Sequence, residues 1–145
     1  MWVLAAVLVI CLALYLAHFA LIGYREAEAE ATLPTTRVVR SWRTRVVGVT
    51  KENTDGTPRQ RVIRDCREGE RLLLLREPRN PYDSNAIKVC RLSGDQIGYI
   101  SSDVAERMAD EMDAGKRFSA RIENITGGSS AKRSLGVNIV IAVHE

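Results

Sequence analysis

The residues best suited to chemistry in this sequence lie between Leu75 and Val89, which read LREPRNPYDSNAIKV. Within this segment the aromatic Tyr82 is followed directly by the carboxylate of Asp83. An aromatic ring can stack on a nucleobase and cations can attract phosphates, so these types suit a binder of single-stranded nucleic acid. Three basic residues supply the charge: Arg76, Arg79 and Lys88.

The NPYD sequence itself predicts a turn. Asn80 precedes a proline and is therefore extended, while Asp83 can bond the backbone of the turn and leave Tyr82 projecting. Tyr99 offers a second aromatic ring. The residues alone favour a plain structural turn with Tyr82 as a packing residue.

The cysteines and histidines indicate neither a metal site nor a nucleophile. Cys11 falls in an apolar run, and Cys66 and Cys90 stand alone with no CxxC spacing and no neighbouring histidine. His18 also lies in the apolar run and His144 is the penultimate residue, so a serine or cysteine nucleophile has no evident base. We expect Cys66 and Cys90 to be ordinary core or half-buried thiols, and we expect no metal or cofactor.

Two further segments resemble enzymatic motifs only superficially. TGGSSAKRS at 126–134 lacks the spacing of a phosphate loop, because the second required glycine falls on Lys132. Asp83 precedes Ala86 and Lys88, and a metal-dependent nuclease would carry a second acid where Ala86 stands. The expected function is therefore binding, without enzymatic activity.

The elements that position these residues are mostly strands. Alternating apolar residues from Arg37 onward predict six or seven short strands, and Leu72–Leu75 reads as a strand buried on both faces. We predict a mainly β fold with one or two short helices, a small OB-like, partly open antiparallel barrel. The principal predicted strands are 38–46, 60–63, 71–76, 86–91, 96–100, 118–122 and 137–143.

One segment changes its period from two to about four. Val104, Met108 and Met112 predict an amphipathic helix. Asp103 with Glu106 three residues later is typical of a capping box at its start, and Gly115 is a natural stop.

The first 23 residues differ in composition from the rest of the chain, since they contain no Lys, Arg, Asp or Glu. Residues 2–22 would span about 31 Å as a helix, close to the hydrocarbon thickness of a bilayer. A cleaved signal peptide is the alternative, but it requires a basic start and a shorter apolar stretch. We therefore predict a transmembrane anchor at 1–23, a linker at 24–36 and a β-barrel domain at 37–145.

The charges after this span predict its orientation. Arginines follow it at 25, 37, 40 and 43, whereas only the α-amino group precedes it. By the positive-inside rule the N-terminus lies outside and the C-terminal domain lies in the cytoplasm. We expect a single-pass protein of the cell membrane, held in the lipid bilayer through residues 2–22.

From Val46 to Val143 the sequence resembles the HIRAN domain, a small barrel found in certain fork-remodelling helicases and in short bacterial proteins. The resemblance rests on VVG at 46–48, LREP at 75–78, NPYDSNAIKV at 80–89 and IGY at 97–99. It implies an OB-like fold that recognises the 3′-hydroxyl end of single-stranded DNA. For such an end Asp83 is a suitable acceptor at the closed end of the groove, where it would repel a terminal phosphate. The ATPase motor of those helicases lies elsewhere in their chains.

The sequence departs from the helicase members directly after VVG. Those members carry a basic residue and an aromatic there, whereas this chain has Val49–Thr50–Lys51 with no aromatic ring. We expect a membrane-tethered module that binds a single-stranded DNA end. The alternative is a membrane-bound adaptor whose barrel binds a protein or a nucleotide-like ligand. The candidate binding residues are Lys51, Arg76, Arg79, Asn80, Tyr82, Asp83, Lys88 and Tyr99.

Overall fold

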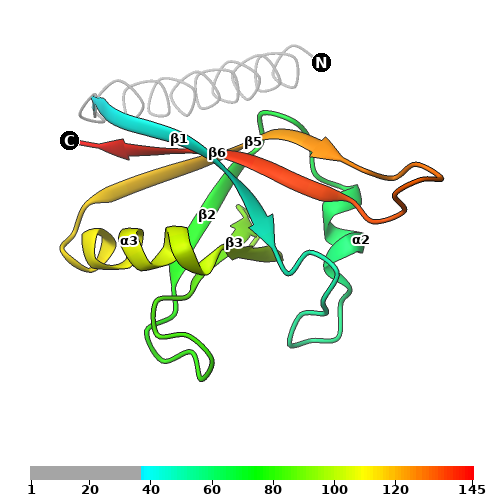
Figure 1. Cartoon of the computed structure of the whole chain (residues 1–145), viewed down its shortest axis with the longest axis horizontal. Coiled ribbons are helices and arrows are strands. Elements are labelled where there is room, and N and C mark those ends of the chain that lie inside the picture. Colours follow the sequence, from blue (N-terminus) through cyan, green and yellow to red (C-terminus); the bar gives the residue numbers. More distant parts are fainter. Residues whose placement is uncertain (1–36) are drawn as a thin grey trace, which may run out of the picture. The chain divides into compact units, whose positions relative to one another are not determined.

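The computed structural model describes residues 37–145, so the predicted span at 2–22 and linker at 24–36 lie outside the described residues. Six strands form a closed antiparallel barrel in the order β1-β4-β3-β2-β5-β6 (Figure 1). The strands are β1 Val38–Val47, β2 Arg71–Arg76, β3 Ile87–Arg91, β4 Gln96–Ile100, β5 Arg117–Thr126 and β6 Gly136–His144. The helices are α2 Arg59–Arg64 and α3 Ser102–Asp113.

The expectation of a partly open barrel is wrong, because β1 closes it. This strand pairs with β6 over Val38–Arg45, and its end pairs with β4 through Val46–Ile100 and Val47–Tyr99. The seam is tight, since a Cβ on Gly98 would lie 2.4 Å from the carbonyl oxygen of Val47. Glycine at this position allows the two backbones to approach.

Both helices contribute to the core that fills the barrel. The core consists mainly of the inward residues of the strands, with Ile63 from α2 and Ala105 and Met108 from α3. Figure 1 shows the two helices at opposite ends of the barrel. The predicted strand at 60–63 is therefore wrong, because Val62 and Ile63 both enter the core from one side of a short helix.

Two local predictions also need correction. Leu72–Leu75 is not buried on both faces: Leu72 is buried, but Leu75 is 43% exposed because the outer surface of this strand faces solvent. Helix α3 has Ser101 as its N-cap, with no side-chain capping bond, so the Asp103–Glu106 capping box does not form. The amphipathic pattern is confirmed, with Val104 and Met108 buried.

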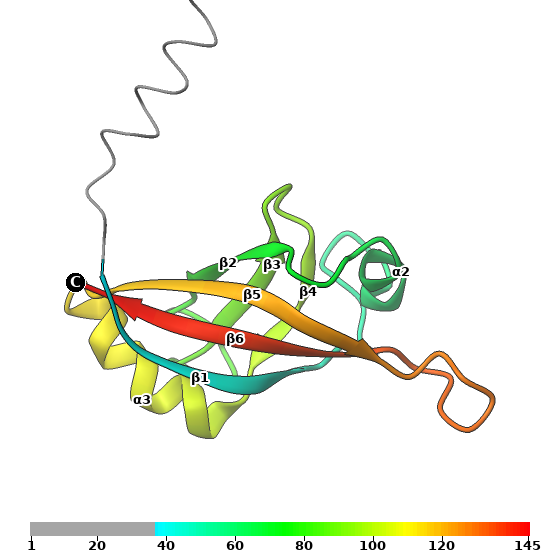
Figure 2. The ribbon, with the colours of Figure 1, turned by 90° about the horizontal axis from the view of Figure 1, so that it is seen from above.

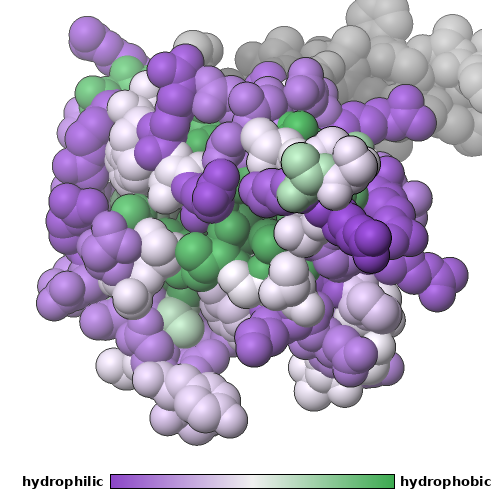
Figure 3. Space-filling view, turned by 45° about the vertical axis from the view of Figure 1, so that its right-hand side comes forward, coloured by the Kyte–Doolittle hydropathy of each residue, from purple (hydrophilic) through white to green (hydrophobic). Residues whose placement is uncertain are grey.

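The outside of the barrel is mainly polar. Figure 2 shows β5, β6 and β1 side by side, and Figure 3 shows hydrophilic side chains over most of one face around an apolar hollow. Neither helix within residues 37–145 has the length and apolar character needed to cross a membrane.

Candidate nucleic-acid interface

The turn that joins β2 to β3, residues 77–86, is braced by its own side chains. The side-chain oxygen Oδ1 of Asn80 accepts hydrogen bonds from the backbone N–H groups of Tyr82 (3.0 Å) and Asp83 (3.3 Å). Oδ1 of Asp83 in turn accepts from the N–H of Asn85 at 2.8 Å. The N–H of Glu77 donates to the carbonyl of Ala86 at 2.9 Å and closes the base of the turn. The NPYD sequence thus forms the predicted turn with its backbone fixed.

Tyr82 stands at the tip of this turn with 96% of its surface exposed. Beside it lies an open hollow of about 540 Å³ between the turn and the start of α3. Three carboxylates line the hollow, so its potential is negative and disfavours a phosphate group. The lining residues are Tyr82, Asp83, Asn85, Ser102, Asp103 and Glu106.

Glu77 connects three of the predicted binding residues. Its Oε1 lies 2.5 Å from Nζ of Lys88, while Oε2 accepts hydrogen bonds of 3.0 Å from Asn80 Nδ2 and Tyr99 Oη. Partial burial acts to raise the pKa of Glu77, but these bonds outweigh it and hold the pKa below its ordinary value. The hydrogen bond to Glu77 likewise raises the pKa of Lys88. The carboxylate therefore fixes the turn to β3 and β4.

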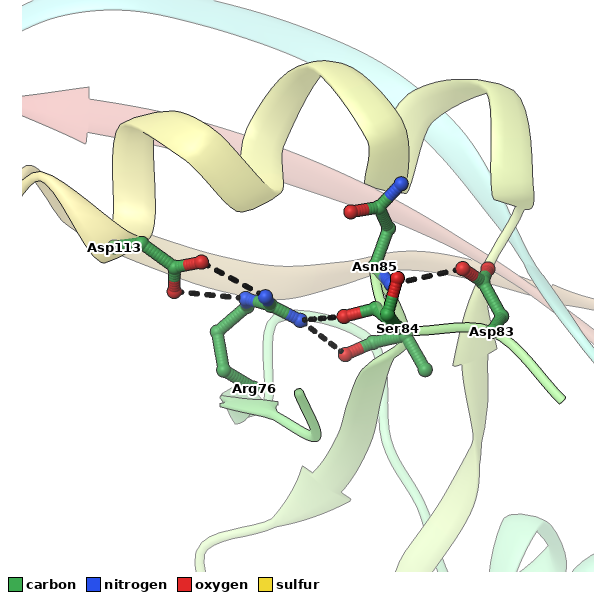
Figure 4. A network of polar contacts seen from close by, with 6 residues as sticks. Arg76, Asp83, Ser84, Asn85 and Asp113 are labelled. Carbon is green, nitrogen blue, oxygen red and sulfur yellow. Dashed lines mark hydrogen bonds and ion pairs between the residues drawn. The ribbon is translucent and has the colours of Figure 1, made fainter. Parts of the chain in front are cut away.

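Arg76 fastens the turn to α3 (Figure 4). Its Nε and Nη2 donate to the two carboxylate oxygens of Asp113 at 3.0 and 2.8 Å, and Nη1 donates to the carbonyls of Ser84 and Ala86. The side chain is only 14% exposed. The pKa of Asp113 is lowered by this bidentate contact. In the structure Arg76 therefore positions the turn.

Arg59 makes a comparable link that the sequence did not single out. It is 8% exposed, and it donates from Nε to Asn53 Oδ1 and from Nη1 to the carbonyl of Gly48, both at 2.9 Å. Its Cζ lies 5.3 Å from the centre of the Tyr99 ring. Gly48 follows β1 and has a positive φ of 70°, as in a turn. Because Arg59 contacts both Gly48 and Tyr99, it links the turn at Gly48 to β4. The one sequence signal for Arg59 is the arginine-rich composition of the segment around it.

The structure thus divides the eight predicted residues into four groups. Tyr82 and Asp83 border the hollow, and Asn80, Lys88 and Tyr99 meet at Glu77. Arg76 is engaged with α3. Arg79 and Lys51 are exposed, and within residues 37–145 neither forms an ion pair.

In a comparison with protein families, residues 40–144 match the HIRAN domain. Helicase-like transcription factor from rabbit (Oryctolagus cuniculus) is 50% identical over 44 residues, and the human protein is 46% identical over 44 residues. Each of these alignments covers 30% of this chain and 4% of the relative. The chain therefore corresponds to a small part of those proteins.

Solved structures show the same fold. The crystal structure of the HIRAN domain of human HLTF has a TM-score of 0.58 and 24% identity, over 75% of this chain and 78% of that one. A protein from Lactobacillus plantarum gives a TM-score of 0.57 and 24% identity, over 77% and 98%. The NMR structure of the HLTF HIRAN domain in its DNA-bound conformation gives 0.53 and 23%, over 76% and 79%.

Proposed function

The chain belongs to the HIRAN domain family, and from this premise we propose that its barrel binds single-stranded DNA through the 77–86 turn. The observation that carries the proposal is Tyr82, whose ring is 96% exposed on a backbone held by Asn80. A ring presented in this way is a ready platform for a nucleobase. The HIRAN domain of HLTF has been solved in a DNA-bound conformation, which supports DNA as the ligand class.

The phosphate backbone would be held by two exposed cations, Arg79 and Lys51. Arg79 lies within the turn, and Lys51 lies in the loop after β1, where its N–H donates to the carbonyl of Gly48. Lys88 and Arg76 are engaged with Glu77 and Asp113, so we assign them to positioning the turn. Binding that depends on a few such contacts weakens as salt is raised.

A titration of a short labelled oligonucleotide, followed by fluorescence anisotropy at several salt concentrations, tests this proposal. Tyr82→Ala should lose roughly 1–3 kcal/mol of binding free energy, because it removes the stacking ring. Leu92→Ala is the matched control, since Leu92 is also exposed but lies in the β3–β4 turn. Unchanged affinity in Tyr82→Ala, or binding indifferent to salt, would favour the adaptor function instead.

We further propose that the bound end is a free 3′-hydroxyl. Within residues 37–145 one oxygen of Asp83 accepts from Asn85, and no hydrogen bond uses the second oxygen. That oxygen is available to accept from a hydroxyl, while Asp103 and Glu106 add negative charge against a phosphate. A linear oligonucleotide should therefore bind better than a circular one of the same sequence, which has no end.

The third part of the proposal is a membrane tether. Residues 2–22 are long and apolar enough to span a bilayer, and the following arginines favour a cytoplasmic domain. Protease added to intact cells should leave the domain uncut, and permeabilised cells provide the control. Digestion of the domain from outside would reverse the proposed topology.

We propose that the domain acts by binding alone. Burial raises the pKa of Cys66 to about 11 and also raises that of Cys90, so neither thiol is a ready nucleophile. His144 Nε2 lies 2.7 Å from the hydroxyl oxygen of Ser119, but Nδ1 of His144 is buried and has no hydrogen-bond partner among residues 37–145. The pair therefore lacks the acid that orients a catalytic histidine. Intact oligonucleotide after incubation with the protein and Mg²⁺ is the expected result.

A further inference from the structure

The outer surface of the barrel carries a row of arginines that four strands bring together. In the sheet register Arg43 of β1 lies opposite Val140 of β6, and Val140 lies opposite Arg121 of β5. Arg121 in turn lies opposite Arg71 of β2. All three arginines are exposed, although they are far apart in the sequence. Two flanking residues, Arg45 and Arg117, are also exposed on β1 and β5.

These five residues, Arg43, Arg45, Arg71, Arg117 and Arg121, form what we call the arginine face. Glu123 is the one acidic residue among the outward side chains of β1, β5 and β6 within the described part of the chain, and it pairs with Arg43. Arg71 and Arg121 sit directly opposite each other, and within residues 37–145 neither has an ion-pair partner. Like charges placed opposite in a sheet destabilise it unless an anion neutralises them.

The arginine face lies away from the candidate DNA-binding turn. In Figure 1, β1, β6 and β5 run across the upper side of the barrel, and the turn between β2 and β3 hangs below it. Helix α3 is opposite in charge, because it carries five acids and a single arginine: Asp103, Glu106, Asp110, Glu111 and Asp113, with Arg107. The domain therefore presents unlike charges on different sides.

We propose that the arginine face docks on a surface of anionic lipid headgroups. A broad basic sheet face fits a plane of negative charge, and each arginine near such a surface strengthens the attraction. The outward positions of β1, β5 and β6 hold no Phe, Tyr or Trp, which single-stranded nucleic acid would use for stacking. Exposed Val38 and Val39 add apolar surface at the start of β1.

The order of the chain supports the same partner. Only residues 23–37 separate the apolar run that ends at Ile22 from the first strand. The docking proposal thus rests in part on the proposed membrane span, but it is independent of DNA binding. With the arginine face on the bilayer, the 77–86 turn would face the cytoplasm and remain accessible to a strand of DNA.

The test uses a protein of residues 37–145, the described range that holds the six strands of the barrel, helices α2 and α3 and the core cluster. Its sedimentation is measured with phosphatidylcholine vesicles that contain or lack phosphatidylglycerol. The test variant is Arg43→Gln/Arg71→Gln/Arg121→Gln. The control variant is Arg61→Gln/Arg64→Gln/Arg107→Gln, which removes the same charge from exposed helix positions. A thermal melt of each protein establishes that it is folded.

We expect the protein to bind only the anionic vesicles. The affinity for them should fall by on the order of a hundredfold in the test variant, or about fivefold per arginine. The control variant should change by less than about tenfold, because charge off the docked face acts through a screened distance. Equal losses in the two variants would overturn the proposal, as would equal binding to neutral vesicles. If the test variant loses oligonucleotide affinity but keeps its vesicle affinity, the face binds nucleic acid and the lipid proposal is wrong.

Discussion

At the scale of single residues, Glu77 controls the geometry of the candidate site. Its carboxylate receives Lys88, Asn80 and Tyr99 at once, so the turn, β3 and β4 share one anchor. Sequence reasoning found all three of its partners and passed over Glu77 itself. An acid next to arginines is typical of surface charge pairing. The role of Glu77 follows from the sheet register, which places Lys88 opposite Tyr99.

Glu77→Gln should lower the free energy of unfolding by about 1–3 kcal/mol, because Lys88 loses its charged partner in a half-buried position. The effect should depend on pH. Because the folded pKa of Glu77 is lowered, its stabilisation is present above the unfolded pKa of about 4.3 and is lost as pH falls through the folded pKa. Urea unfolding at a series of pH values measures this.

The wild-type protein should lose stability more steeply below about pH 5 than Glu77→Gln does. Glu123→Gln is a suitable control, since it removes a carboxylate that pairs with Arg43 on the outer surface. Parallel acid profiles for the wild type and Glu77→Gln would show that the carboxylate does not stabilise the fold.

At the scale of elements, the sequence predicted well which segments form strands. It predicted less well how those strands close into a barrel. The alternation in β1, β5 and β6 matches their burial, because each strand has one face in the core. The same reasoning failed at α2, where adjacent Val62 and Ile63 fit either a strand or a helix. Closure of the barrel depends on two residue pairs between β1 and β4, which no local pattern encodes.

Gly98→Ala tests the importance of that seam. The added Cβ would lie 2.4 Å from the carbonyl oxygen of Val47 and 2.5 Å from Cγ1 of Val46, so one strand must shift. We expect a loss of about 1–3 kcal/mol in unfolding free energy, measured by urea denaturation. Hydrogen exchange should also rise in β4 and at the end of β1. A variant as stable as the wild type would mean that the seam adjusts without cost.

At the scale of the whole molecule, the domain is a closed barrel that carries its own core. Trp42 packs edge-on to Phe118 with 6.3 Å between the ring centres, and Arg40 lies over its ring. A protein of residues 37–145 should therefore unfold cooperatively, with Trp42 as its one tryptophan reporter. Coincident fluorescence and circular dichroism transitions are the expected result. Aggregation or a broad transition would show that residues before 37 contribute to folding.

The central claim is that the 77–86 turn captures a DNA end, and the most direct test compares two oligonucleotides. One ends in a free 3′-hydroxyl and the other in a 3′-phosphate. We predict tighter binding of the hydroxyl end, because the phosphate brings negative charge to a hollow lined by three carboxylates. Asp83→Asn keeps the Oδ1 that accepts from Asn85 but removes the charge, so it should reduce this preference. Equal affinity for the two oligonucleotides, unchanged in Asp83→Asn, would contradict end recognition.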